Sequence, residues 1–548
     1  MTWDNHAVLA RLLTRALTHR AVPWLAALAF VLVGWWAVYA DRFLHDEGVL
    51  TWFFASMIGD APVATFFWQK CRPALALLYA PLAPLGVYPF LCLHVVVTAL
   101  ALPLAAAVAR ALGIRHANVA ALALAGSPLL LVTAAAGVTN ADAVTGLMLA
   151  LYLLHVRAAP LAAGAVLGAL VFVRSEVAVF AVAFAIAALW TPGQRRLLLG
   201  LPLFGALYAL LGMTYHGDVA WFLHYPPALP SPPPEGSMFG PGGYGNASLV
   251  ELVRVSLALT PLFGALALLP ARSLDGRERA LLLAALAFLV LIRGLPFVGL
   301  FNFDDSPRYC LPVLPLVALL LARVFDRLVD GRDSGAWGAL GLTALALAGH
   351  VAAYTSDDAT LLLTAGGVAL LWTIARAGAP RLAAILACAG GIAIAPLLLP
   401  VTRMDFHREL PAYEDAAQWL RDNPARAEGA TLVTNLPVLR IWGARHGALD
   451  PARVEYILGP DMHFELVRLT NADVGQRAAI FAALANNFYG RPRPPEDMRP
   501  DALPERALLL LEPSARTEQV MPPELWRPQL VVLAETPALR IAELRSSR

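Results

Sequence analysis

The chain has 548 residues, of which 59% are hydrophobic and only 15% are charged. Soluble globular proteins are nearer half apolar with about a quarter of their residues charged, so this composition excludes an ordinary soluble domain and indicates a polytopic membrane protein. The net charge of +2 gives no reason to expect a nucleic-acid partner. The four cysteines are scattered without CxxC spacing, which indicates neither a zinc site nor a disulfide framework.

The first apolar segment, residues 21–40, follows three arginines. The apolar core of a signal peptide is normally about 7–15 residues long, whereas this segment is long enough to cross a bilayer, which takes roughly 20 residues. We therefore expect a retained transmembrane helix. A cleaved signal peptide is the alternative, because "VYA" at 38–40 fits the small-residue cleavage pattern.

The polar interruptions that follow are of two kinds, and the two kinds alternate along the chain. One kind is basic, as at Arg195 and Arg323, and the other is acidic, aromatic or rich in Pro and Gly, as at 41–85 and 215–247. Because loops rich in Lys and Arg stay in the cytoplasm, we expect a cytoplasmic N-terminus and acidic loops outside. About 13 transmembrane helices result, near residues 21–40, 86–109, 117–136, 141–156, 160–173, 176–191, 197–214, 249–270, 280–299, 309–325, 335–354, 359–375 and 382–400.

The apolar run at 160–191 is divided by "RSE" at 174–176. If the run were one tilted helix, every later loop would change sides, and the later basic loops would break the positive-inside rule. Two spans are therefore expected. Thirteen spans then place the C-terminus outside.

After Pro400 the composition shifts, because charged residues, Asn and Pro become common and no further segment could span a membrane. We expect residues 1–400 to form a transmembrane catalytic domain and 401–548 to form an extracytoplasmic domain of ordinary size. Helical spacing is found in "AYEDAAQWLRDN" and "VGQRAAIFAALANNFY", whereas "ATLVTN" and "RALLLLEP" are typical of strands. An α/β fold is predicted for this second domain.

The first outer loop, residues 41–85, carries the acidic pair Asp46 and Glu47 and, later, the cations Lys70 and Arg72. Its Phe and Trp residues, among them Phe53 and Trp68, make it too apolar to be freely solvated, which favours short amphipathic helices at the membrane surface. A carboxylate held there is a better base than one in bulk water. The structural alternatives are a solvated helix end for the acidic pair and lipid-headgroup anchoring for the cations.

Other outer loops add further candidates. Asp142 in "TNAD" begins a span, where an acid can also serve only as a helix cap. Arg308 and Tyr309 in "DDSPRYCLP" lie at the mouth of a later span. The Pro- and Gly-rich residues 215–247 are typical of a lid, and Arg174 and Glu176 could simply pair with each other.

This layout resembles the membrane-embedded GT-C glycosyltransferases, and most of all the branch that includes protein O-mannosyltransferases and the aminoarabinose transferase of lipid A. The resemblance rests on "HDEG" directly after the first helix, "QKCRP" some 25 residues later, "TNAD" in the second outer loop and "RYCLPVLP" late in the bundle. Members of this branch take a sugar from a polyprenyl-phosphate carrier on the outer side of the membrane. The bacterial lipid A enzyme also has thirteen spans and an extracytoplasmic C-terminal domain. The absence of a "WWDYG"-type motif argues against an oligosaccharyltransferase.

The resemblance implies roles for three acids. Asp46 matches the catalytic Asp of the first loop, with Glu47 beside it, and Asp142 matches the acid of the second loop. A polyprenyl phosphate leaves without a proton from a general acid, so the reaction needs only one base, which takes the proton of the acceptor hydroxyl. We expect Asp46 to be this base, while Glu47 or Asp142 orients the acceptor or shares the proton. Attack opposite the phosphate inverts the anomeric centre.

The resemblance also implies a cationic site for the donor phosphate. Lys70 matches the basic residue that meets this phosphate, and Arg72, which stands where a small or apolar residue is usual, could share the role. Arg308 and Tyr309 belong to the late motif, where phosphate or loop contacts are expected. These cations stabilise the charge on the leaving phosphate, so no cofactor is expected. The alternative is a divalent metal such as Mg or Mn between the outer acids, as some GT-C enzymes use.

The sequence therefore predicts an inverting glycosyltransferase, monomeric in the inner (cell) membrane, that moves a sugar from a polyprenyl-phosphate donor to a hydroxyl on a lipid, glycan or protein. One alternative is a lipid or polysaccharide transporter or flippase. Transporters usually carry ionisable residues at mid-membrane and interrupted helices in matched halves, whereas these spans are almost free of internal charge. The other alternative is a surface-polysaccharide ligase or polymerase, which typically lacks a terminal domain of this size.

Overall fold

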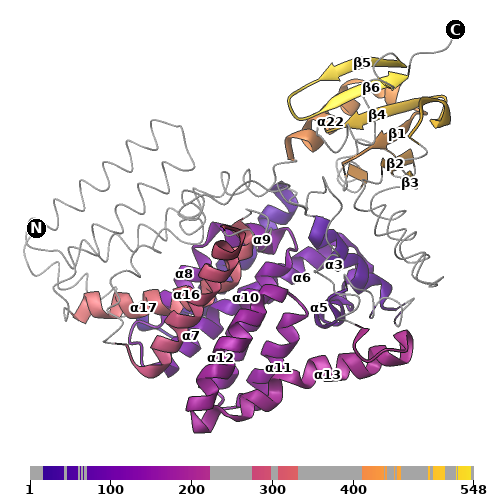
Figure 1. The fold of residues 1–548 in the computed structure, drawn as a ribbon. Coiled ribbons are helices and arrows are strands. Elements are labelled where there is room, and N and C mark those ends of the chain that lie inside the picture. The colour runs from indigo at the N-terminus through magenta and orange to yellow at the C-terminus, as the bar shows by residue number, and fades with distance from the viewer. Residues whose placement is uncertain are drawn as a thin grey trace, which may run out of the picture. The chain divides into compact units, whose positions relative to one another are not determined.

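The structure, a computed structural model, describes residues 17–41, 46–59, 62, 66, 71–221, 274–297, 307–330, 410–436, 439–440, 450, 453–457, 491–493, 498–512, 526 and 529–544 (Figure 1). The chain divides into two compact units. The first, here called the helical unit, comprises Met1–Phe43, Arg72–Pro230 and Pro241–Phe406. The second, called the sheet unit, comprises Leu44–Cys71, Ser231–Gly240 and His407–Arg548.

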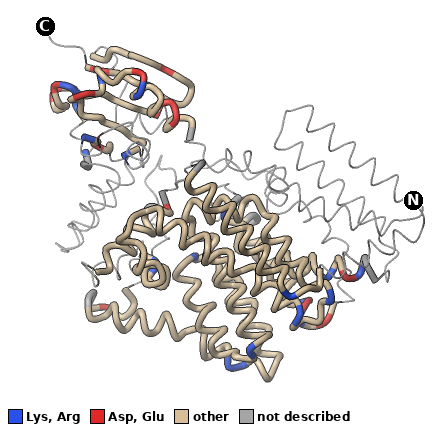
Figure 2. Tube along the Cα trace, turned by 180° about the vertical axis from the view of Figure 1, so that it is seen from behind, with Lys and Arg blue, Asp and Glu red and all other residues tan. Residues whose placement is uncertain are grey.

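The described part of the helical unit consists of helices and short helical turns. In chain order they are α2 (Val22–Trp36), η1 (Ala37–Asp41), α5 (Pro73–Tyr79), η2 (Ala83–Leu85), α6 (Val87–Ala99), α7 (Ala101–Ala111), α8 (Asn118–Ala125), α9 (Pro128–Ala135), α10 (Thr139–His155), α11 (Pro160–Val171), η3 (Ser175–Val177), α12 (Ala178–Trp190), η4 (Pro192–Gln194), α13 (Arg196–His216), α16 (Gly276–Phe297), η7 (Pro307–Val313) and α17 (Leu314–Asp330). In Figure 2 the charged residues of this unit lie mostly at helix ends and connections, and the helix bodies are nearly free of them.

Within the described residues, four stretches are long and apolar enough to cross a membrane: Val22–Tyr39, Val87–Ala111, Pro192–Thr214 and Arg308–Arg327. Each coincides with a predicted span. The expectation of a helical, polytopic membrane protein therefore agrees with the structure, while the total of about 13 spans remains a prediction. The predicted spans near 249–270, 335–354, 359–375 and 382–400 lie outside the described residues.

The predicted span at 117–136 coincides with two helices, α8 and α9, rather than one straight helix. α8 and α9 meet at a bend of 61°. Pro128 begins α9 and forces the residue before it out of the helical region, and Ser127 is accordingly extended, with φ −86° and ψ 111°. The Ser127 side chain then accepts a hydrogen bond from the Leu130 amide at 3.3 Å, which caps the new helix.

The run at 160–191 forms two helices, α11 and α12, which are joined by η3. α11 approaches the backbone of α13 closely, because a Cβ atom at Gly164 or Gly168 would overlap the carbonyl oxygen of Leu197 or Leu201. Small residues four apart permit such contact between helices in a membrane, where packing and not the hydrophobic effect holds helices together. The end of α11, which leads to Arg174, is therefore firmly placed.

The sheet unit contains a six-stranded sheet with the order β3-β2-β1-β4-β6-β5. Its strands are β1 (Thr431–Thr434), β2 (Val454–Ile457), β3 (Arg491–Arg493), β4 (Ala507–Leu511), β5 (Leu530–Glu535) and β6 (Arg540–Leu544). β1 to β4 pair in parallel, with Leu432 opposite Leu508, and β6 pairs antiparallel with both β4 and β5. The all-apolar β4, which lies between β1 and β6, is buried along its whole length, as expected for an interior strand of a sheet.

Helices of this unit include α3 (Asp46–Met57), α22 (Leu410–Asp422), α23 (Pro424–Ala427) and the turn η12 (Pro500–Ala502). The predicted strands in "ATLVTN" and "RALLLLEP" are observed as β1 and β4, and the predicted helix in "AYEDAAQWLRDN" is α22. The helix predicted at 474–489 lies outside the described residues.

Candidate functional site

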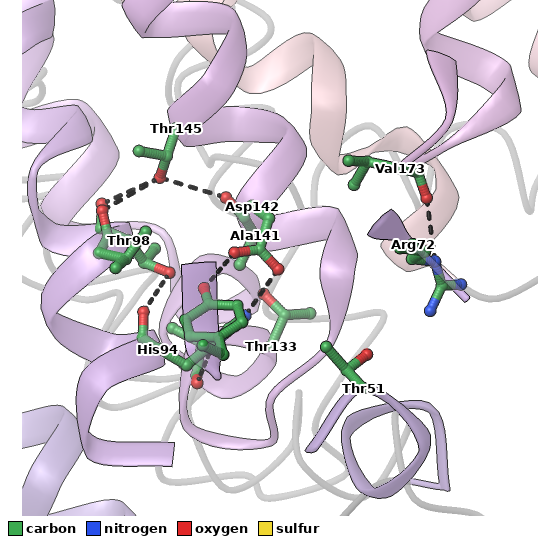
Figure 3. A network of polar contacts seen from close by, with 12 residues as sticks. Thr51, Arg72, His94, Thr98, Thr133, Ala141, Asp142, Thr145 and Val173 are labelled. Carbon is green, nitrogen blue, oxygen red and sulfur yellow. Dashed lines mark hydrogen bonds and ion pairs between the residues drawn. The ribbon is translucent and has the colours of Figure 1, made fainter. Parts of the chain in front are cut away.

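Asp142 is at the centre of a buried polar network in the helical unit. It lies in the first turn of α10 and is 3% exposed. The Tyr79 hydroxyl, at the end of α5, donates a hydrogen bond to Oδ1. Nε2 of His94, on α6, lies 2.9 Å from Oδ2 (Figure 3). Both carboxylate oxygens are thus bound by side chains from two other helices.

The hydrogen bonds of His94 fix the number of protons in this network. Nδ1 lies 2.7 Å from the carbonyl oxygen of Ala134, which can only accept. A neutral imidazole has one N–H, but the two ring nitrogens of His94 face two acceptors, the Ala134 carbonyl and the Asp142 carboxylate. One more proton is therefore needed, either on the ring or on the Asp142 carboxyl. With that proton the His94–Asp142 pair is neutral overall. Neutrality lowers the desolvation cost of burying the carboxylate.

Tyr79 is fully buried against the rings of Phe90 and His94, whose centroids lie 5.0 and 5.6 Å from its own. Burial, the negative charge of Asp142 and the hydrogen bond to it raise the pKa of Tyr79 well above its ordinary value. The hydroxyl therefore stays protonated at physiological pH. It acts as a permanent donor to Asp142.

A second polar group surrounds Tyr309 in η7. The guanidinium carbons of Arg174 and Arg308 lie 5.0 and 5.1 Å from the centroid of its ring. These are distances for cation–π interactions. A terminal nitrogen of Arg308 also lies 3.5 Å from the Tyr309 hydroxyl. The Tyr309 ring thus makes cation–π contacts with two arginines.

A third arginine lies beside this group. Nε of Arg72 donates to the carbonyl oxygen of Val173 at 3.0 Å, one residue before Arg174 (Figure 3). The buried Arg174 binds Glu176 through Nε and Oε1 at 2.7 Å. We call Arg72, Arg174, Arg308, Tyr309 and Glu176 the arginine cluster. As defined, the cluster contains three cations and one carboxylate.

α10 connects the two groups. Asn140, two residues before Asp142, is buried, and its Nδ2 lies 3.5 Å from Oε1 of Glu176. Within the described residues, the amide oxygen of Asn140 has no hydrogen-bond partner. One turn of α10 therefore contacts the arginine cluster through Asn140 and the Tyr79–His94 network through Asp142.

Four of the predicted site residues lie in the helical unit. Arg308 contacts Tyr309, and Arg72 binds the backbone next to Arg174, whereas Asp142 belongs to the separate buried network. The pairing of Arg174 with Glu176, considered as an alternative from the sequence, is observed.

The remaining predicted residues lie elsewhere. Asp46 and Glu47 begin α3 in the sheet unit, where Glu47 is 8% exposed and its carbonyl accepts from the Thr51 hydroxyl at 2.9 Å. Lys70 and most of the proposed lid at 215–247 lie outside the described residues. The described part of the chain contains no group of three or more His, Cys, Asp and Glu residues arranged for a metal ion.

Sequence reasoning missed His94 and Tyr79 as partners of Asp142. The available signal was His94 itself, an ionisable residue in the apolar run "FLCLHVVVT", because such residues in membrane spans usually have a partner and a role. Tyr79 carried no comparable signal, since a Tyr in an apolar segment near a membrane surface is common. The contact of Arg174 with the Tyr309 ring was also missed, because it joins residues that are far apart in the chain.

No family model and no curated protein matches the chain. Two solved structures match nearly its whole length. ArnT from Cupriavidus metallidurans in the apo state has a TM-score of 0.54 at 16% identity, over 96% of this chain and 98% of that one. The same protein bound to undecaprenyl phosphate has a TM-score of 0.52 at 15% identity, over 96% of this chain and 99% of that one. The chain thus has the fold of ArnT, a lipid A aminoarabinose transferase of the GT-C type, and the expected resemblance is confirmed at the level of fold.

Proposed function

We propose that the protein is an inverting glycosyltransferase that moves a sugar from a polyprenyl-phosphate carrier to a hydroxyl group. The observation that carries this proposal is the arginine cluster within an ArnT-like fold: Arg174 and Arg308 both lie over the Tyr309 ring, and Arg72 binds the backbone carbonyl next to Arg174. ArnT has been solved with undecaprenyl phosphate bound. The same class of lipid phosphate is the proposed donor here.

The chemistry of the arginine cluster suits a phosphate. A guanidinium group presents N–H donors in a planar fork that matches two phosphate oxygens. Arg174 and Arg308 are held against the Tyr309 ring, so little side-chain entropy is lost when they bind an anion. Cations fixed in advance also stabilise the charge that gathers on the leaving phosphate. Lys70, two residues before Arg72 in the chain, is proposed to join them.

Asp46 is the proposed base and takes the proton of the acceptor hydroxyl as the oxygen attacks the anomeric carbon. Glu47 is proposed to orient this hydroxyl. The carbon–oxygen bond to the phosphate breaks as the new glycosidic bond forms, and the phosphate leaves as the anion bound by the arginines. The proposed acceptor is a lipid, glycan or protein, and this proposal requires no metal ion. The reaction is assigned to the outer face of the inner (cell) membrane, with the N-terminus in the cytoplasm.

A transfer assay with purified protein tests this function. A panel of polyprenyl-phosphate sugars is incubated with the wild type and with Asp46→Asn, and consumption of donor and release of the polyprenyl phosphate are followed by chromatography. Asp41→Asn, in the same loop, is the matched control. We expect transfer by the wild type and the control and a loss of at least a hundredfold in Asp46→Asn. Equal transfer by all three would exclude Asp46 as the base, and a wild type that consumes no donor across the panel would contradict the transferase.

A further inference from the structure

Both carboxylate oxygens of Asp142 already bind side chains of the protein. Oδ1 accepts from Tyr79 and Oδ2 is bound to His94, and the residue is almost completely buried. A base or an acceptor-orienting group must reach the proton it handles within hydrogen-bond distance. This arrangement instead suits a residue that holds other parts of the protein in place.

The element that Asp142 holds is α5. This helix has only seven residues, about 10 Å in length, and a helix so short is not stable by itself. A polar contact fixes each of its ends. Arg72, the residue before its first turn, binds the Val173 carbonyl oxygen, and Tyr79, its last residue, binds Asp142.

The Arg72–Val173 contact and the Tyr79–Asp142 contact each connect α5 to the arginine cluster. Val173 directly precedes Arg174, and α10, which carries Asp142, also carries Asn140 beside Glu176. Displacement of Tyr79 from Asp142 would therefore move α5 and the Arg72 guanidinium relative to Arg174. His94 fixes the carboxylate itself, because its ring is held by the Ala134 carbonyl on the far side.

We propose that Asp142 is a positioning residue that holds Arg72, through Tyr79 and α5, at the place where the lipid phosphate binds. This inference rests on the proposed function for the identity of the anion. Asp142 acts on the affinity for the donor and not on the proton transfer. Tyr79 and His94 belong to the same positioning unit.

The substitution Asp142→Asn separates positioning from proton transfer. The introduced amide oxygen accepts from the Tyr79 hydroxyl, and the amide N–H donates to Nε2 of a neutral His94, whose Nδ1–H still donates to Ala134. The three hydrogen bonds remain, but the carboxylate and its extra proton are gone. A positioning role predicts affinity for undecaprenyl phosphate within about twofold of the wild type and a similar kcat.

Two other substitutions break the contact. Tyr79→Phe removes only the hydroxyl, and Asp142→Leu removes the acceptor. For each we expect about tenfold weaker binding of undecaprenyl phosphate, as a lost hydrogen bond to a charged group implies, and a higher KM for the donor with kcat within about threefold. Because both act through one contact, the double variant should bind no more weakly than Asp142→Leu.

The experiment is a titration of undecaprenyl phosphate into full-length protein in lipid nanodiscs, with donor KM and kcat measured in parallel. Thr145→Val is the matched control: its hydroxyl lies on α10 and bonds the Ala141 carbonyl at 3.3 Å, and its hydrogen bonds within the described residues are to α6 and α10 and not to α5. Thermal unfolding and size-exclusion profiles establish which variants are folded. If Asp142→Leu fails to fold, Tyr79→Phe and Asp142→Asn still decide the question.

The outcomes separate the inference from the proposed function. A wild type that binds no undecaprenyl phosphate would overturn both. A wild type that binds it, with Tyr79→Phe binding equally well, would overturn the positioning role and leave the donor site intact. Loss of kcat in Asp142→Asn with unchanged affinity would assign Asp142 to the chemistry instead.

Discussion

Asp326 binds His116 through two hydrogen bonds, although the residues lie 210 positions apart in the chain. Its Oδ1 accepts from the backbone amide of His116 at 2.8 Å and lies 2.6 Å from the ring Nδ1. Its Oδ2 accepts from the backbone amide of Arg115 at 2.5 Å. One carboxylate near the end of α17 thus satisfies the backbone of the connection between α7 and α8.

Removal of this carboxylate should destabilise the helical unit. In Asp326→Ala the buried amide of His116 loses its acceptor, and we expect a decrease in the free energy of unfolding of about 2–4 kcal/mol. Asp326→Asn keeps one accepting oxygen and should lose about half as much. Thermal unfolding in detergent measures the difference, and an Asp326→Ala variant that melts with the wild type would contradict it.

The contact between α11 and α13 should not tolerate a side chain. A methyl group at Gly168 would overlap the backbone of Leu201, which cannot move aside as a flexible side chain could. We expect Gly168→Ala to lower the melting temperature by several degrees or to reduce the yield of monodisperse protein. Gly193→Ala is the control, since nothing lies within 4 Å of a Cβ atom there. Equal behaviour of the two variants would show that the helices can separate without cost.

Arg174 should contribute to phosphate binding through its planar guanidinium. We expect Arg174→Ala to weaken undecaprenyl phosphate binding about tenfold and Arg174→Lys to weaken it less, since Lys keeps the charge but not the fork. Because both substitutions alter the ion pair with Glu176, thermal unfolding must be measured alongside. Arg195→Ala, an exposed arginine at another connection, should bind as the wild type does. Unchanged affinity in a folded Arg174→Ala would exclude this arginine from the donor site.

The pKa of Tyr79 predicts a loss of stability at alkaline pH. The pKa in the folded protein is raised above the ordinary value of about 10. The corresponding stabilisation is therefore fully present below pH 10 and is lost as the pH rises from the unfolded towards the folded pKa. The melting temperature of the wild type should fall more steeply between pH 9.5 and about 11.5 than that of Tyr79→Phe. Parallel curves would indicate that Tyr79 ionises as a solvent-exposed Tyr does.

Local hydropathy was sufficient to predict the long apolar helices. Val22–Tyr39 and Val87–Ala111 appear where uninterrupted apolar runs predicted them, because twenty apolar residues have few alternatives to a membrane helix. The bend between α8 and α9 was missed, although "GSP" at 126–128 contains both the cap and the proline that produce it. Hydropathy alone does not reveal such a bend, since the residues on both sides of it are equally apolar.

The candidate site could be predicted only in part. Arg72 and Arg308 were identified by their motifs, but the contacts of Arg72 with Val173 and of Arg174 with Tyr309 join residues 101 or more positions apart. The Asp142 network likewise joins residues 48 and 63 positions apart. No local pattern encodes such distances, so the sequence indicated an acid at the start of a span and not that Tyr79 and His94 would enclose it.

The glycines of α11 have a consequence for motion. Since no side chains separate α11 from α13 near Gly164 and Gly168, the two helices cannot slide along each other without backbone atoms colliding. The carbonyl oxygen of Val173, just beyond the end of α11, is thus held by main-chain geometry and not by side-chain rotamers. Thermal fluctuations of the surrounding lipid should therefore reach the guanidinium of Arg72 only weakly, which would keep the proposed phosphate site in place while the bilayer around it deforms.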